Sequence, residues 1–213
     1  MTQRTIVHLL RHGEVFNPDG VLYGRLPDFH LSDLGREMAV RAAEATQDRD
    51  IAVVTASPLD RAQETATPAA ELHNLPIGTD DDLIEAANIF EGERVSVGDG
   101  VLRQPKLWRH LWNPLRPSWG EPYVEIAERM QRAVDRARDA ARGREALLVS
   151  HQLPIWTIRL ALENRRFAHD PRNRQCSLAS ITSLLYDDDV LAAIVYTEPC
   201  ADLVARSNKA TGA

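Results

Sequence analysis

Cysteine is almost missing from this chain, with Cys176 and Cys200 as the only two in 213 residues. Two cysteines are too few for a disulfide framework or for the cysteine clusters that hold structural zinc. We expect both to be reduced thiols. The sequence therefore predicts a fold held together by a hydrophobic core, for which the chain is long enough.

Long apolar runs are missing as well, and so is an excess of positive charge. No run approaches the length needed to span a bilayer. The early run "IVHLL" is too short for a secretory leader and is followed directly by charges. We therefore expect a cytoplasmic protein with no membrane partner. The formal net charge of -6 argues against nucleic acid as a partner.

What the chain does contain is a regular alternation of strand-like and helix-like segments. The expected strands are residues 5–10, 51–57, 75–79, 145–151 and two strands within 179–198 that meet at a turn of three aspartates. The expected helices are residues 30–46, 57–73, 120–143 and 152–164. Such alternation predicts an α/β fold with a mainly parallel sheet covered on both faces. We expect one catalytic domain over residues 1–200, with an irregular insertion at about 88–120 and a flexible tail at 201–213.

Two serines are expected to start helices. Ser32 precedes a helical repeat of apolar residues and is a plausible N-cap. Ser57 is followed by Pro58 and Asp60, which together resemble a capping box with proline at the first helical position.

Polar side chains follow three of the predicted strands, where each strand ends. Arg11 and His12 come after the first strand, Ser57 and then Arg61 after the second, and His151 after the strand at 145–150. The carboxyl ends of parallel strands meet at one edge of a sheet, and ligand sites form there. We therefore expect these five residues to lie close together.

Each of these residues alone has an ordinary explanation, because a single histidine at a strand end is usually structural. Three independent coincidences at one edge are harder to accept than one shared site. The other histidines show no such grouping. We interpret four that lie in or beside strands, loops or helix ends as structural: His8, His30, His73 and His169. His110, within the insertion, remains open.

Two arginines and two histidines at one edge favour a phosphate ligand. Guanidinium groups bind phosphate oxygens in pairs, and the start of a helix after Ser57 adds backbone amides. A neutral histidine is also a competent nucleophile toward phosphorus. Phosphoryl transfer then needs a proton donor for the leaving oxygen, and Glu14 and Glu85 are the candidates. Glu85 could equally be an exposed acid in a loop.

These segments resemble those of the histidine phosphatase superfamily, also called the phosphoglycerate-mutase-like family. "LLRHGE" is similar to its hallmark strand-end motif, and "SPLDRAQETA" to its second phosphate-binding segment. "LIE" before "EG" resembles its proton-donor segment, and "LLVSHQ" its second-histidine segment. Together the matches run from residue 6 to about residue 162.

The resemblance implies a role for each matching residue. His12 would be the nucleophile that becomes a phosphohistidine, while Arg11, Arg61 and His151 would hold the phosphate. Glu85 would be the general acid and then the base that activates water. The side chains supply the positive charge, so neither a metal nor another cofactor is implied.

The same resemblance extends to the fold and to the rest of the site. It implies a three-layer α/β/α sandwich around a six-stranded sheet. Asn17 is similar to a phosphate-contacting asparagine of the family. The expected substrate-binding set is Asn17, Gly24, Arg25 and Ser57.

The predicted function is that of a phosphatase acting on a small or medium phosphomonoester. A phosphoglycerate mutase is the alternative within the same family, but "EAANIFEGE" does not resemble the basic-aromatic run that follows the acid in such mutases. A non-catalytic binder of phosphorylated ligands is a third possibility. Gln152 departs from the family pattern, which often has glycine after the second histidine.

The substrate and the oligomeric state do not follow from the sequence. "LWRHLWNPLRPSW", residues 107–119, mixes aromatic surface with Arg109, His110 and Arg116. This stretch is either a packed insertion or a lid that contacts the alcohol portion of the substrate.

Overall fold

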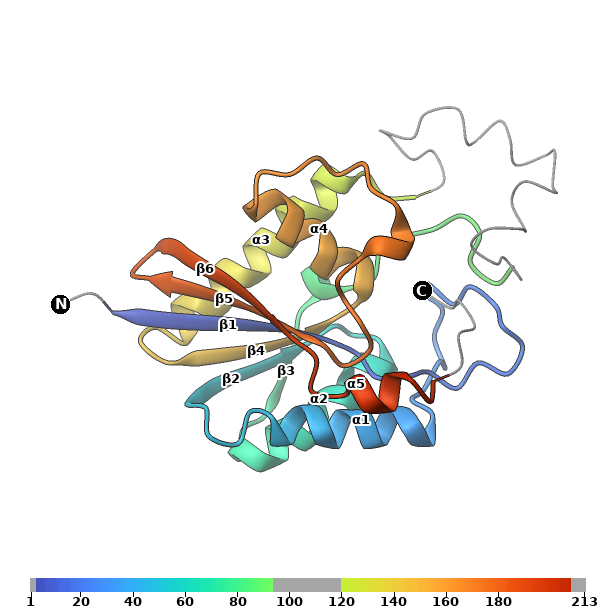
Figure 1. Ribbon diagram of the computed structural model, residues 1–213, viewed down its shortest axis with the longest axis horizontal. Coiled ribbons are helices and arrows are strands. Elements are labelled where there is room, and N and C mark those ends of the chain that lie inside the picture. Colours follow the sequence, from blue (N-terminus) through green and yellow to red (C-terminus); the bar gives the residue numbers. More distant parts are fainter. Residues whose placement is uncertain (1–2, 94–119, 208–213) are drawn as a thin grey trace.

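The computed structural model describes residues 3–93 and 120–207 (Figure 1). The predicted lid, with Arg109, His110 and Arg116, lies outside these ranges. The strands are β1 (Arg4–Arg11), β2 (Ile51–Ala56), β3 (Ile77–Thr79), β4 (Glu145–Ser150), β5 (Ile181–Asp187) and β6 (Val190–Thr197). The helices are α1 (Asp33–Glu44), α2 (Asp60–His73), α3 (Tyr123–Ala140), α4 (Gln152–Leu162) and α5 (Ala201–Val204), with 3-10 turns at η1 (Asp81–Leu83) and η4 (Pro171–Asn173). None of the helices in these ranges is long and apolar enough to cross a membrane.

All six strands form one sheet in the order β3-β2-β4-β1-β5-β6. The pairs β3–β2, β2–β4 and β4–β1 are parallel, as predicted. The prediction of a mainly parallel sheet is nevertheless wrong, because β1–β5 and β5–β6 are antiparallel and the sheet is mixed. The chain makes the predicted hairpin after β5, with Asp188 at φ 55°, and this hairpin adds to the free side of β1.

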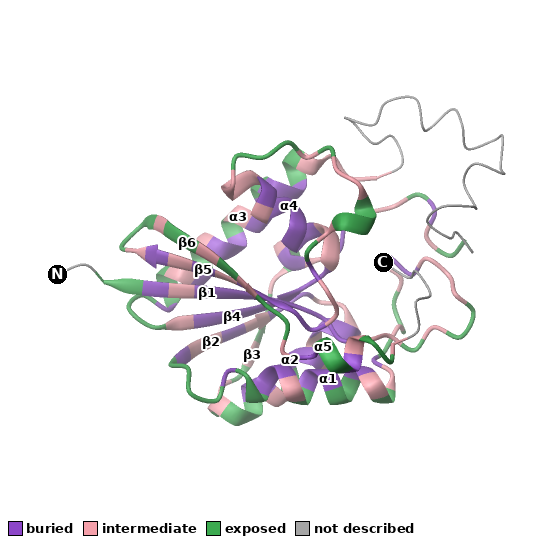
Figure 2. Cartoon of the chain, in the orientation of Figure 1, coloured by how far each residue is buried: buried purple, intermediate pink, exposed green. Residues whose placement is uncertain are grey.

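Side chains of the central strands alternate between two apolar clusters. Val7 and Leu9 of β1 pack in a cluster with residues of α3 and α4. Leu10 packs in the other cluster, with residues of α1, α2 and α5. Figure 1 shows the same division, with α3 and α4 on one side of the sheet and α1, α2 and α5 on the other. Strands β1 and β4 are both buried at their carboxyl ends, where the site forms (Figure 2).

The two helix starts expected from the sequence have different outcomes. Ser32 is the N-cap of α1, and its Oγ accepts a hydrogen bond of 2.9 Å from the backbone amide of Gly35. The capping box at α2 is wrong, because the helix begins at Asp60 with Leu59 as a cap that makes no side-chain bond. The hydroxyl of Ser57 pairs with His151 at 2.8 Å and accepts only a longer bond, of 3.4 Å, from the amide of Leu59.

The tail expected after residue 200 begins with a packed segment instead. Residues Ala201–Val204 form α5, and Leu203 is 2% exposed within the cluster that also contains Met38 of α1. The thiol of Cys200 lies 3.4 Å from the carbonyl oxygen of Met38. Burial of Leu203 favours this docking, which a sequence of small and polar residues did not indicate.

Candidate active site

The loops after β1 and β4 bring two histidines together at the carboxyl edge of the sheet. Arg11 pairs in register with Ser150, so His12 and His151 leave the sheet side by side. Their ring centroids are 5.1 Å apart, and both side chains are fully buried. The predicted meeting of these strand ends is thus present in the structure.

His12 is held as a neutral imidazole. Its Nδ1 lies 2.7 Å from the carbonyl oxygen of Gly13, an acceptor, so Nδ1 carries the proton. Burial, followed by the charges of Arg61 and Arg11, holds the pKa of His12 well below 6.5. Nε2 is buried and has no hydrogen-bond partner among the described residues. This nitrogen therefore presents a lone pair.

Arg11 and Arg61 bring two guanidinium groups into the same cluster, where both lower the pKa of His12. Arg61 is fully buried and donates a hydrogen bond of 2.6 Å to the carbonyl oxygen of Gly24. Its guanidinium carbon lies over the Tyr23 ring, 4.7 Å from the ring centroid. Arg11 donates a hydrogen bond of 2.8 Å to the carbonyl oxygen of Cys176. Neither arginine forms an ion pair with a carboxylate in the described part of the chain, so both charges remain to be matched by an anion.

His151 completes the cluster. Its Nε2 lies 2.8 Å from the hydroxyl of Ser57, whose backbone amide is fixed by the carbonyl of Val149 at 2.9 Å. Burial, followed by Arg61 and His12, holds the pKa of His151 well below 6.5. Its buried Nδ1 lacks a partner within the described ranges. Ser57 therefore orients His151, although the sequence assigned it to substrate binding.

Glu85 supplies a carboxyl group to the same cluster. It is 5% exposed, and its Oε1 accepts a bond of 2.8 Å from the backbone amide of Ala86. Burial raises the pKa of Glu85 above 4.5, although the Ala86 amide, Arg61 and Arg11 act in the opposite direction. Oε2 is buried and unpartnered among the residues described. A carboxyl of this kind keeps its proton to higher pH than an exposed one.

The segment that carries Glu85 is fixed by two arginines that share one carboxylate. Arg25 donates a hydrogen bond of 2.6 Å to the carbonyl oxygen of Glu85 and one of 2.8 Å to the carboxylate of Glu121. Arg129 also binds the carboxylate of Glu121, at 2.8 Å, and donates a hydrogen bond of 2.6 Å to the backbone carbonyl of Asp82. These contacts make Arg25 a positioning residue for Glu85, whereas the sequence predicted a substrate contact.

Replacing Arg25 by glutamine is therefore expected to lower kcat about 10-fold for alkyl phosphates, because the acid is held less accurately. The effect on p-nitrophenyl phosphate should be small, since its leaving group needs no protonation. Steady-state kinetics on both esters test this, with Arg41→Gln as an exposed control on α1. A raised KM for both esters at unchanged kcat would instead indicate that Arg25 contacts the phosphate.

Two other residues of the predicted substrate-binding set serve the loop after β1. The side-chain amide of Asn17 donates a hydrogen bond of 2.9 Å to the backbone carbonyl of Val21. It also accepts one of 3.2 Å from the backbone amide of Val21. Gly24 has a positive φ of 42° and offers its carbonyl to Arg61. Glu14, the other acid candidate, accepts a bond of 2.5 Å from the hydroxyl of Ser32.

Gly13 allows a close approach of backbone segments. A Cβ at Gly13 would lie 2.5 Å from the carbonyl oxygen of Gly35, and one at Gly35 would meet the carbonyl of Glu14. The loop after β1 is thus pressed against the first turn of α1. This contact fixes the backbone that carries His12 and its Gly13 acceptor.

The family of the chain follows from a comparison of its sequence with known protein families. The model of the histidine phosphatase superfamily (branch 1) matches residues 7–198, which include every residue of the cluster. The chain belongs to this superfamily.

The relatives of this superfamily member include a phosphatase and a probable mutase. Rv0525 of Mycobacterium tuberculosis, described only as uncharacterized, is 59% identical over 94% of this chain and 100% of its own length. A probable phosphoglycerate mutase, GpmB of Yersinia pestis, is 28% identical over 82% of this chain and 83% of its own. The structure of the mycobacterial glucosyl-3-phosphoglycerate phosphatase Rv2419c has a TM-score of 0.70, with 27% identity over 92% of this chain and 97% of its own.

Two residues of the superfamily site escaped the sequence analysis. Tyr23 is 5% exposed, with its ring centroid 6.5 Å from that of His12. Arg174, in the loop before β5, interacts electrostatically with Glu85 and Arg11. No motif marks either residue, because both come from irregular loops whose path depends on the tertiary fold.

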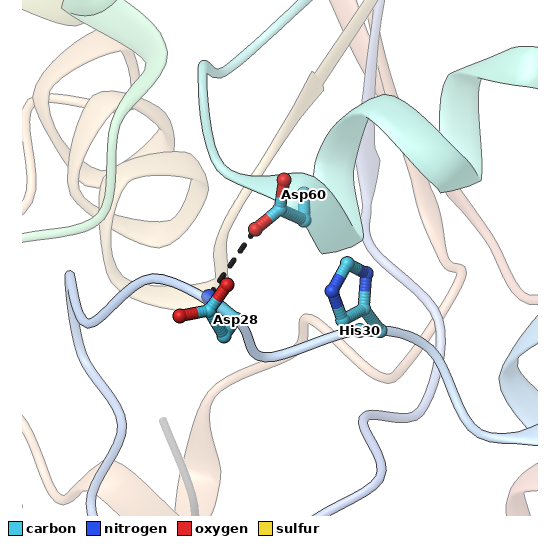
Figure 3. A group of neighbouring side chains, drawn as sticks. All are labelled: Asp28, His30 and Asp60. Carbon is cyan, nitrogen blue, oxygen red and sulfur yellow. Dashed lines mark hydrogen bonds between the residues drawn. The ribbon is translucent and has the colours of Figure 1, made fainter.

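A second group of polar residues lies apart from this cluster, at the surface. Asp28, His30 and Asp60 have possible ligand atoms within 4.8 Å of one another (Figure 3). Asp60 accepts a bond of 3.3 Å from the amide of Asp28, and His30 pairs with Glu64 at 2.5 Å. The Glu64 hydrogen bond raises the pKa of His30. Asp28 and His30 are exposed, and the imidazole of His30 is already engaged by Glu64, so we assign no metal to this group.

Proposed function

We propose that this histidine phosphatase hydrolyses a phosphomonoester through a phosphohistidine at His12. The observation that carries the proposal is the state of His12, whose neutral ring presents an unpartnered Nε2 in a buried cluster with two arginines that lack carboxylate partners. A phosphate between Arg11 and Arg61 would satisfy both charges and present its phosphorus to this nitrogen. The expected partner is a small-molecule phosphate ester.

In the first step, the Nε2 lone pair of His12 forms a bond to phosphorus while the bond from phosphorus to the alcohol oxygen breaks. Oε2 of Glu85 gives its proton to that oxygen, so the alcohol leaves neutral. The proton stays on Nδ1 of His12, hydrogen-bonded to the carbonyl oxygen of Gly13. Arg11, Arg61 and His151 stabilise the charge on the transferring phosphoryl group.

In the second step, water attacks the phosphohistidine. The Glu85 carboxylate accepts a proton from the water as the new oxygen–phosphorus bond forms and the nitrogen–phosphorus bond breaks. Inorganic phosphate leaves, His12 is again neutral and Glu85 is again protonated. These five side chains supply the nucleophile, the proton transfers and the positive charge that both steps need.

Hydrolase activity is favoured over mutase activity, although the relative GpmB keeps the second activity under consideration. A mutase must retain a doubly phosphorylated intermediate, which needs further cations near the site. Among the predicted candidates, Arg25 is engaged by Glu85 and Glu121. The chain also lacks the basic-aromatic run after Glu85.

Supplying 3-phosphoglycerate with a trace of 2,3-bisphosphoglycerate tests this choice. We expect phosphate release from a phosphomonoester without efficient conversion to 2-phosphoglycerate, measured by phosphate assay and by NMR of the phosphoglycerates. His12→Ala should release no phosphate in the same assay. Rapid interconversion of the two isomers with little free phosphate would show that the chain is a mutase.

A further inference from the structure

Thr65 lies on α2, one helical turn after Arg61, and its side chain is fully buried. Its Oγ1 has two backbone partners. One is the carbonyl oxygen of Arg61, at 2.6 Å, and the other is the backbone nitrogen of Gly13, at 3.1 Å. A single hydroxyl therefore contacts both the helix that carries Arg61 and the loop that carries His12.

The direction of both hydrogen bonds follows from the chemistry of the partners. A hydroxyl has one proton, and the carbonyl oxygen of Arg61 can only accept, so Oγ1 of Thr65 gives its proton there. The amide of Gly13 can only donate, so Oγ1 accepts that bond through a lone pair. The bond back along the helix thus orients the hydroxyl as an acceptor for the loop.

The Gly13 amide is one of three main-chain groups that hold His12 in place. The backbone N–H of His12 donates a hydrogen bond of 3.1 Å to the carbonyl of Ser150, and its carbonyl accepts one of 3.3 Å from the amide of Ala179. These two bonds attach His12 to β4 and to the segment before β5. The Gly13 amide donates to a side chain instead, so a substitution at Thr65 can remove this third contact.

The orientation of the His12 ring depends on the same short segment. Nδ1 of the ring donates a hydrogen bond of 2.7 Å to the carbonyl oxygen of Gly13, which fixes the proton on Nδ1. The direction of this carbonyl depends on the contacts on both sides of Gly13. Thr65 holds the amide on one side, and on the other side the carbonyl of Glu14 accepts a bond of 3.0 Å from the amide of Ser32.

Thr67 offers a comparison on the same helix. Its Oγ1 also bonds to the carbonyl four residues earlier, that of Gln63, at 3.0 Å. Thr67 is exposed, however, and within residues 3–93 and 120–207 its hydroxyl has no bond to another segment. An ordinary threonine of α2 thus makes the helical bond alone, whereas Thr65 is buried and adds the bond to the loop.

We propose that Thr65 is a positioning residue for the nucleophile. Its hydroxyl fixes the Gly13 amide, so that the Gly13 carbonyl keeps the ring proton of His12 on Nδ1 and leaves Nε2 free to attack. The same hydroxyl fixes the loop of His12 against the helical turn of Arg61. The catalytic part of this inference rests on the proposed phosphatase function, whereas the state of the His12 ring can be measured without turnover.

Replacing Thr65 by valine keeps the shape of the side chain and removes the hydroxyl. The buried Gly13 amide then lacks its acceptor, and we expect kcat to fall about 10- to 100-fold for p-nitrophenyl phosphate and for an alkyl phosphate alike. KM should change less than about 3-fold, because the arginines of the site remain. The loss on both esters distinguishes Thr65 from Arg25 and Glu85, whose replacement should largely spare p-nitrophenyl phosphate.

The ring of His12 gives a readout that a merely structural role would not change. Two-bond proton–nitrogen NMR spectra of isotope-labelled histidine, assigned with His12→Ala, should show wild-type His12 with a protonated Nδ1 and a bare Nε2 at neutral pH. Thr65→Val should show both neutral tautomers. Thr65→Ser keeps a hydroxyl and should restore the single tautomer, with kcat within about 3-fold of wild type.

Two further variants complete the test. Thr67→Val removes an equivalent helical bond and should leave both kcat and the tautomer of His12 unchanged. Thr65→Cys has a much weaker acceptor and should show an intermediate loss of kcat, which keeps the test decisive if the valine variant does not fold. Thermal unfolding of each variant confirms that the protein is folded in the assay.

Several results would overturn the inference. A folded Thr65→Val with wild-type kcat and a single tautomer would refute it, and an equal loss in Thr67→Val would assign the effect to a weakened α2. A loss that serine does not restore would assign it to packing of the methyl group. Failure of the wild-type protein to hydrolyse any phosphomonoester would refute the phosphatase function. In that case a changed tautomer in Thr65→Val would still support the positioning role, and an unchanged one would refute it as well.

Discussion

His12→Ala is expected to lower kcat for p-nitrophenyl phosphate by about 10,000-fold or more, because no other described group presents an equivalent lone pair to the phosphate. Nδ1 of His151 is also unpartnered, but Ser57 holds the other nitrogen of that ring. Even a good leaving group needs the nucleophile, so the loss should be similar for every ester. Phosphate release over a range of enzyme concentrations measures it.

The control for this experiment is His30→Gln. His30 is an exposed histidine outside the site, and its replacement should leave kcat within about 2-fold, as for an ordinary surface change. Circular dichroism of His12→Ala checks that the buried site still folds. Turnover of a folded His12→Ala within 10-fold of the wild-type rate would mean that another group attacks phosphorus.

Glu85→Gln is expected to slow hydrolysis of alkyl phosphates by about 100- to 10,000-fold, the usual contribution of a positioned general acid. The loss should be much smaller for p-nitrophenyl phosphate, because nitrophenolate leaves without a proton. An amide keeps the size of Glu85 and can still accept from the Ala86 amide, so the fold should be preserved. Glu128→Gln, an exposed acid on α3, is the matched control.

The pH profile gives the same prediction a second readout. His12 must be neutral to attack, and burial holds its pKa well below 6.5, so the acid limb should lie below the usual histidine range. Glu85 must be protonated to donate, and burial raises its pKa above 4.5, so the rate on alkyl phosphates should fall as pH rises through that raised value. Glu85→Gln should remove this alkaline limb. Equal losses on both kinds of ester, with the limb retained, would direct attention to Glu14.

The residues that the sequence predicted correctly share one property. Arg11, His12 and His151 follow apolar strands directly, and Arg61 lies one turn into the helix after another strand. Parallel pairing of neighbouring strands brings such residues to one edge, so their proximity follows from local patterns and one topological rule. The structure places all four in one buried cluster.

The failures arose where tertiary contacts decide the outcome. Whether the C-terminal hairpin joins β1 in an antiparallel manner depends on which edge of the sheet is free, which no local pattern encodes. Ser57 has the sequence signature of a helix cap, but pairing with buried His151 competes successfully for its hydroxyl. The partners of Arg25 are Glu85 and Glu121, which lie 60 and 96 residues away in sequence, so its role depends on the assembled fold.

The most direct test of the phosphohistidine is rapid-quench trapping with a labelled phosphomonoester. The neutral His12 ring, with its proton on Nδ1, predicts that label appears within a single turnover and is stable to base but labile to acid. Peptide mapping should locate the phosphoryl group on Nε2 of His12, and His12→Ala should retain none. Full retention of label in folded His12→Ala, or acid-stable label on another residue, would contradict the proposed mechanism.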